Sequence, residues 1–95
     1  MINEQDEAMQ CYERALDVRK RVFGDEDADV ASSYNNLGVM YYKKGDNAKS
    51  IINFKEALRI RRETLDDLKH EKIGDTLHNM VRTLMFLIYQ NVVTD

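Results

Sequence analysis

The sequence contains no proline, a single cysteine and no long run of apolar residues among its 95 positions. The absence of proline, together with short apolar runs that do not alternate with polar residues, favours an all-α fold. The one cysteine, Cys11, cannot form a disulfide within the chain, which is consistent with a reducing compartment. The longest apolar run covers residues 84–89, which falls far short of the roughly 18–20 residues that cross a bilayer.

Charge and composition narrow the expected class further. The chain is 43% hydrophobic and 33% charged, with a formal net charge of −3, which is typical of one globular domain and argues against a nucleic-acid partner. The N-terminal segment carries Glu4, Asp6 and Glu7, whereas a signal peptide has a basic and then an apolar segment. We therefore predict a cytoplasmic protein without a membrane partner.

Four segments place apolar and small residues at helical spacing. We expect helices over about 3–22, 28–44, 47–66 and 71–90, with Gly24 and Gly45 ending two of them and Asp27 and Asp46 capping the helices that follow. The tight glycine turn at Gly45 makes the second and third helices antiparallel. The expected core of the two middle helices is Val30, Tyr34, Leu37, Gly38, Tyr41, Ala48, Ile51, Phe54, Ala57, Leu58, Arg61 and Leu65. The expected core of the outer two is Ala8, Cys11, Tyr12, Ala15, Leu16, Arg19, Val22, Ile73, Leu77, Met80, Val81, Leu84, Leu87 and Ile88.

The segments also repeat one another. Residues 12–19 (YERALDVR) align with residues 54–61 (FKEALRIR) at a shift of 42, and Asn36-Leu37 aligns with Asn79-Met80 at a shift of 43. Repetition at this period indicates a solenoid of stacked helical hairpins. We expect residues 1–23 to form helix B of one repeat, residues 28–66 a complete repeat, and residues 71–90 helix A of a further repeat, all in one domain over residues 1–95.

The central repeat resembles the tetratricopeptide repeat, and the residues that carry this resemblance are Tyr34, Leu37, Gly38, Tyr41, Gly45, Phe54 and Ala57. The 42-residue period and the long link resemble the kinesin-light-chain-like type. The resemblance implies an all-α superhelix of about four helices. The chain departs from that type at Asp27-Ala28, where His-Pro is usual, at Ser50, which replaces an alanine, and at Val81, which replaces a glycine. No motor, kinase or ATPase motif accompanies the repeats, so nothing ties the chain to kinesin itself.

Catalytic and metal-binding groupings are missing from the sequence. It has no phosphate-binding glycine loop, no Cys-x-x-Cys and no His-Glu-x-x-His. A zinc site from Cys11, His70 and His78 would need residues far apart in the chain to meet, and the acidic residues 25–29 lack the glycine and final glutamate of a calcium loop. The basic clusters at 19–21 and 59–62 lie at helix C-terminal ends, where cations are favoured, so we prefer this interpretation to an RNA or membrane patch. We expect no enzyme activity, no cofactor and no metal.

The resemblance implies that the A helices line a concave surface that binds a peptide segment of a partner. The candidate partner-binding residues are Asn35, Asn36, Val39, Tyr42, Lys43, His78, Asn79, Arg82 and Phe86. Each asparagine in a helix interior costs roughly 0.6 kcal/mol relative to alanine. By resemblance, Asn36 and Asn79 would pair with the backbone of the peptide, with apolar contacts from the aromatic residues and attraction of acidic side chains by Lys43 and Arg82. The alternative is that these asparagines bond only to neighbouring helices or to water.

The C-terminal segment is apolar around the whole helix. Residues 84–89 are followed by Val92 and Val93, and an exposed patch of this kind marks an interface or a longer array. We expect self-association through residues 80–93, the alternative being that the chain is a fragment of a longer solenoid. The predicted function is a non-catalytic adaptor or scaffold, and the alternative is a structural spacer or homo-oligomerisation segment.

Overall fold

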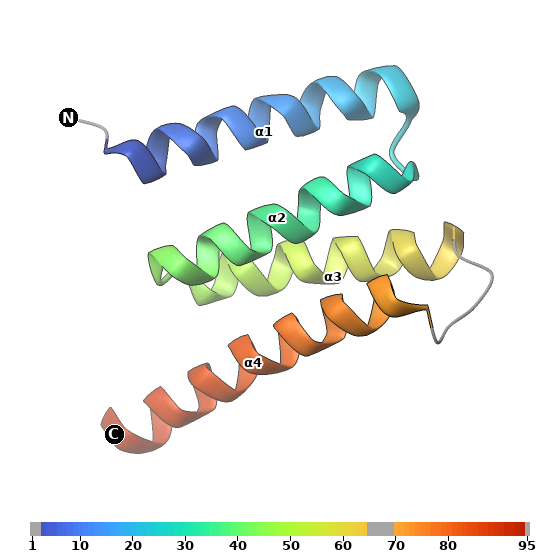
Figure 1. Ribbon diagram of the computed structural model, residues 1–95. Coiled ribbons are helices and arrows are strands. Elements are labelled where there is room, and N and C mark those ends of the chain that lie inside the picture. Colours follow the sequence, from blue (N-terminus) through green and yellow to red (C-terminus); the bar gives the residue numbers. More distant parts are fainter. Residues whose placement is uncertain (1–2, 65–69, 95) are drawn as a thin grey trace.

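The computed structural model describes residues 3–64 and 70–94, and in those ranges it contains helices and no strand (Figure 1). The helices are α1 (Glu4–Phe23), α2 (Ala28–Lys44), α3 (Asn47–Thr64) and α4 (Glu71–Thr94). The all-α prediction is confirmed. The predicted end of the third helix, including Leu65, and the link at 67–69 lie outside the described residues.

Capping side chains and glycines set the helix boundaries at the predicted places. The Asp27 carboxylate accepts a hydrogen bond from the backbone N–H of Asp29 at 2.7 Å, and the Asp46 carboxylate accepts one from the N–H of Lys49 at 3.1 Å. Gly45 has φ +92°, a backbone conformation that side-chain-bearing residues rarely adopt. The turn between α2 and α3 therefore depends on a glycine followed by an aspartate.

The last helix begins where the sequence predicts and ends later. His70 Nδ1 accepts a hydrogen bond from the N–H of Lys72 at 3.1 Å, so this side chain caps α4. The helix continues past Gln90 to Thr94. Neither glycine nor proline follows Gln90, and without such a residue the helical pattern has no local stop.

Successive helices run antiparallel and lie side by side in chain order (Figure 1). The molecule measures 43 × 39 × 16 Å along its principal axes. One helix with its side chains is roughly 10–12 Å across, so the shape is a thin plate. Each helix therefore buries its apolar residues mainly against its neighbours in sequence, as in a solenoid.

The closest packing joins α2 to α3 at Gly38. The ring of Phe54 is fully buried, and a Cβ atom added to Gly38 would lie 2.6 Å from two of its carbons. Beside this contact, the buried Ser50 hydroxyl donates a 2.7 Å hydrogen bond to the carbonyl oxygen of Gly38. The departure from alanine at position 50 thus adds a polar link between the two helices.

Only one flank of α1 is covered. Met9 and Leu16 are buried, but the predicted core residues Cys11, Tyr12 and Ala15 are exposed. Tyr12 is 42% exposed, whereas Phe54, its counterpart 42 positions later, is 0% exposed. The reason is that α2 packs on the flank of α1 that carries Leu16, and no described helix covers the flank of Tyr12. The other predicted core positions that the structure leaves exposed in α1 and α3 are Arg19, Val22 and Ala48.

The predicted core stripe of α4 is likewise divided between two flanks. Ile73, Thr76 and Thr83 are buried, and Met80 and Leu87 are partly buried. Four predicted core residues are exposed, namely Leu77, Val81, Leu84 and Ile88. The periodicity identified the helix correctly, but it did not show which part of its apolar surface meets α3.

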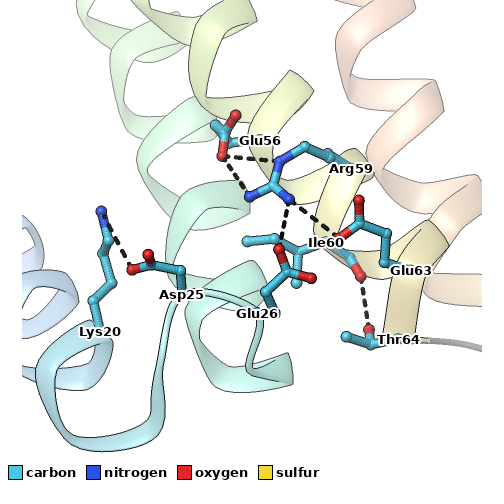
Figure 2. A network of polar contacts seen from close by, with 8 residues as sticks. All are labelled: Lys20, Asp25, Glu26, Glu56, Arg59, Ile60, Glu63 and Thr64. Atoms are coloured by element: carbon cyan, nitrogen blue, oxygen red, sulfur yellow. Dashed lines mark hydrogen bonds and ion pairs between the residues drawn. The ribbon is translucent and has the colours of Figure 1, made fainter.

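The link between α1 and α2 is held by one ion pair to α3 and another to α1 (Figure 2). The Arg59 guanidinium contacts the carboxylates of Glu26 at 3.0 Å, Glu56 at 3.1 Å and Glu63 at 3.2 Å. Hydrogen bonds from Glu63 and Arg59 lower the pKa of Glu26, and the contact with Glu26 raises the pKa of Glu63. Arg59 thus joins the acidic link to α3. On α1, Lys20 lies 4.0 Å from Asp25 of the same link.

The contact at Gly38 generates a stability prediction with an internal control. We expect Gly38→Ala to lower the free energy of unfolding by about 1–3 kcal/mol, because the added methyl group displaces the buried Phe54 ring. Gly74→Ala is the matched control, since a Cβ there meets nothing within 4 Å, and we expect a gain of up to about 1 kcal/mol from helix propensity. Urea denaturation followed by circular dichroism measures both. Equal effects of the two substitutions would contradict the close approach.

Candidate partner-binding surface

Three of the predicted partner-binding residues meet across α2 and α4. The rings of Tyr42 and Phe86 pack edge to face, with centroids 6.1 Å apart and planes at 73°. The Arg82 guanidinium carbon lies 4.8 Å from the centroid of the Tyr42 ring. An aromatic pair with a cation over one face has both the flat apolar area and the positive charge that recognition surfaces use. We call Tyr42, Arg82 and Phe86 the aromatic–arginine cluster.

The remaining predicted residues lie on the same two helices at different depths. Asn36, Lys43 and His78 are exposed, whereas Val39 and Asn79 are partly buried. Within residues 3–64 and 70–94, no carboxylate forms an ion pair with Lys43 or with Arg82 of the cluster.

Asn35 is engaged inside the fold. Its side-chain oxygen accepts a 3.1 Å hydrogen bond from the Thr76 hydroxyl, which itself accepts one from Arg61 Nη1 at 2.5 Å. The same nitrogen of Arg61 donates to the carbonyl oxygen of Lys72 at 3.0 Å, and Nη2 donates to the Ser32 hydroxyl at 3.4 Å. Arg61 is only 7% exposed. This buried network joins α2, α3 and α4, and it places Asn35 in a structural interaction.

Burial sets the electrostatics of that network. It lowers the pKa of the Arg61 guanidinium, while the negative charge of Asp75 acts in the opposite direction. A buried cation with a missing partner is destabilising, so each of the acceptors around Arg61 matters to the fold.

The same kind of contact occurs one repeat earlier. Arg19 Nη1 on α1 donates a 2.5 Å hydrogen bond to the buried Ser33 hydroxyl on α2. Arg19 precedes Arg61 by 42 residues, and Ser33 precedes Thr76 by 43. We call these two contacts the arginine–hydroxyl links. The sequence analysis missed them, although a hydroxyl residue at the same place in both copies was the signal that could have revealed them.

The chain belongs to the tetratricopeptide repeat family, because the profile of that family matches residues 3–63. The match covers α1, α2 and nearly all of α3 as described. No curated protein matches the sequence. The family is a class of protein–protein interaction modules that are typically non-catalytic.

None of the helices in residues 3–64 and 70–94 is long and apolar enough to span a bilayer. Over the same ranges, no three His, Cys, Asp or Glu side chains gather closely enough to hold a metal ion. Cys11 is an exposed free thiol.

The buried network predicts that the hydroxyl of Thr76 matters more than its shape. Thr76→Val keeps the volume but removes an acceptor from Arg61 and a donor to Asn35, so we expect stability to fall by about 1–3 kcal/mol. The control is Thr64→Val, because the exposed Thr64 hydroxyl donates to the carbonyl oxygen of Ile60 one turn earlier in the same helix and lies outside the buried network. We expect that control to change stability by less than about 0.5 kcal/mol. Thermal or urea unfolding of both variants measures the difference, and losses of the same size would argue against the network.

Proposed function

We propose that the chain is a non-catalytic adaptor that binds an extended segment of a partner protein on a concave surface formed by α2 and α4. The observation that carries this proposal is the aromatic–arginine cluster, in which residues 40 positions or more apart in sequence meet at the boundary of the two helices. Aromatic residues and arginine are the side chains most enriched among strongly contributing interface residues. Their partial exposure leaves contact area for a ligand.

In this proposal the asparagines fix the orientation of the bound peptide. Asn36 is exposed on α2 and Asn79 is partly buried on α4, one repeat apart. An amide side chain can donate to a peptide C=O and accept from a peptide N–H at the same time. Two such amides on neighbouring helices fix the position and direction of an extended backbone, whatever its sequence. The buried network around Asn35 supports different roles for the two neighbours, because Asn35 faces the fold and bonds within it, whereas Asn36 faces outward, where a ligand can bind.

The charges favour an acidic ligand. Lys43 and Arg82 have no carboxylate partner among the described residues, and opposite charge on a ligand raises both association rate and selectivity. Val39 adds partly buried apolar surface beside Asn36. The proposed ligand is therefore a segment that combines apolar side chains with Asp or Glu.

The proposal also states how the four helices are divided into repeats, which type of repeat they form and where in the cell the protein is located. In it, α1 is helix B of one repeat, α2 and α3 form a complete repeat, and α4 is helix A of the next. The two arginine–hydroxyl links support this phasing, since equivalent positions make equivalent contacts. The 42-residue shift supports the kinesin-light-chain-like type. The single exposed cysteine is consistent with a cytoplasmic location.

A second candidate function is a spacer or homo-oligomerisation segment whose concave surface binds nothing. The exposed apolar residues of α4 favour it, because large apolar side chains from Leu77 to Val92 remain uncovered in the described chain. A spacer predicts that the asparagines act on stability alone, whereas an adaptor predicts that they act on ligand capture.

Selection from a display library of random 15-residue peptides tests the adaptor. We expect enriched peptides to carry apolar residues flanked by Asp or Glu. The double variant Asn36→Ala/Asn79→Ala should weaken binding of the selected peptide by at least about 5-fold, since two to four hydrogen bonds of about 0.5–1.5 kcal/mol each are lost. Fluorescence anisotropy with a labelled peptide measures the change.

Asn53→Ala is the matched control. Asn53 lies on α3, where its amide bonds to the carbonyl oxygen of Lys49, so we expect peptide affinity to stay within twofold. Circular dichroism should show unchanged helix content in all variants. A library that yields no enriched peptide, or a double variant that binds as well as the unmodified chain, would refute the concave-surface proposal and favour the spacer.

A further inference from the structure

The uncovered surface of α4 carries four apolar residues at heptad spacing. Its exposed residues Leu77, Val81, Leu84 and Ile88 follow one another at spacings of four, three and four. In heptad terms Val81 and Ile88 occupy the a positions and Leu77 and Leu84 the d positions. β-branched residues at a and leucine at d are the combination typical of two-stranded helix pairs. We call these four residues the outer seam.

The outer seam is separate from both surfaces already described. Ile73, Thr76 and Thr83 of α4 are buried in the fold, and the aromatic–arginine cluster uses Arg82 and Phe86. With 3.6 residues per turn, each step along the helix rotates the side chain by about 100°. The seam accordingly lies roughly a quarter-turn from the buried residues and nearly opposite Arg82 and Phe86.

The seam is also apolar and wide. Its four residues are between 37% and 56% exposed, and Met85 and Val92 beside it are more than half exposed. Arg82 is the only Asp, Glu, Lys or Arg residue between positions 76 and 92, and it lies on the other flank. Uncharged apolar surface of this extent is rare on an isolated domain and indicates a partner whose contacting surface is also apolar and uncharged.

A helix that continued the array in the usual way would not fit this surface. Position 81 corresponds to Gly38, which is 43 residues earlier, and there the ring of Phe54 leaves no room even for a Cβ atom. Val81 supplies a Cβ and two methyl groups at that place. An aromatic residue seated as Phe54 is would therefore collide with Val81.

This collision also argues against head-to-tail stacking of copies. The exposed flank of α1 carries Tyr12, which corresponds to Phe54. If α1 of a second copy lay on α4 as α3 lies on α2, the Tyr12 ring would fall on Val81. Such stacking is in addition head-to-tail, so it would either close into a ring or propagate into a fibre.

We propose that the outer seam pairs with the outer seam of a second copy of this chain, giving a closed two-fold dimer through α4. A heptad seam of Leu, Val, Leu and Ile is self-complementary, because each side chain can insert between residues of the same kind on the facing helix. The two-fold arrangement covers both seams at once and leaves the Asn36 and Arg82 surfaces free. It refines the self-association expected for residues 80–93 and does not depend on peptide binding.

The test is the molar mass of the chain in sedimentation equilibrium over about a hundredfold range of concentration. We expect the mass to rise from 11.1 kDa towards twice that value and no further. Ile88→Glu places a charge in the seam, and we expect it to raise the dissociation constant of the dimer at least about 30-fold. Circular dichroism checks that the variant keeps its helix content.

Two control variants separate this dimer from other associations. Ile52→Glu alters an equally exposed isoleucine on α3, 60% exposed against 56% for Ile88, and should leave the dimer unchanged. Tyr12→Glu should do the same, because α1 does not take part. A mass that stays at 11.1 kDa at every concentration, a mass that grows beyond the dimer, or a dimer that Tyr12→Glu abolishes and Ile88→Glu spares would each overturn the proposal. None of these outcomes bears on peptide capture, which is measured on the other surface.

Discussion

The structure depends on the close approach of α2 and α3 at Gly38. Phe54 occupies the space that any side chain at this position would fill, and Ser50 bonds to the carbonyl oxygen of the same glycine. This contact sets the separation of the two helices, and the separation decides where α1 and α4 can pack on either side. The spacing of the surface residues on α2 and α4 follows from it, so that the rings of Tyr42 and Phe86 come into contact.

Polar groups then fix the relative positions of successive helices. Hydrophobic packing alone is non-directional, whereas the arginine–hydroxyl links accept one geometry each. Arg61 is the stronger example, because its buried guanidinium donates to partners on α2 and α4. Arg59 acts in a comparable way at the surface, where three carboxylates surround one cation and the acidic link before α2 is drawn to α3 (Figure 2). The stacking of the repeats is thus specified by charge as well as by shape.

Much of the fold could be predicted from residue spacing and local chemistry. The glycine and aspartate at 45 and 46 fixed a turn, and the shift of 42 residues indicated repetition, because both signals depend only on nearby residues. The flanks of α1 and α4 could not be assigned in this way. A stripe of apolar residues shows that a helix is amphipathic, but it does not show which neighbour covers which part, so Tyr12 and Val81 were placed in the core.

The candidate surface could likewise be predicted only in part. Tyr42, Arg82 and Phe86 were named from their helix face, and the structure brings them together. Asn35 was named on the same grounds, yet it bonds to Thr76 inside the fold. Asn35 and Asn36 differ by about 100° of rotation about the helix axis. Residue spacing alone does not tell which of the two faces the fold unless the packing partner of the helix is known.

The plate is only 16 Å thick, and this dimension has a consequence for how the protein opens. Since each helix is secured mainly by adjacent helices, backbone amides should exchange with solvent in steps. Met9 and Leu16 are the only buried residues of α1, which makes that helix the first to detach, while the amides around Phe54 remain protected until the whole chain unfolds.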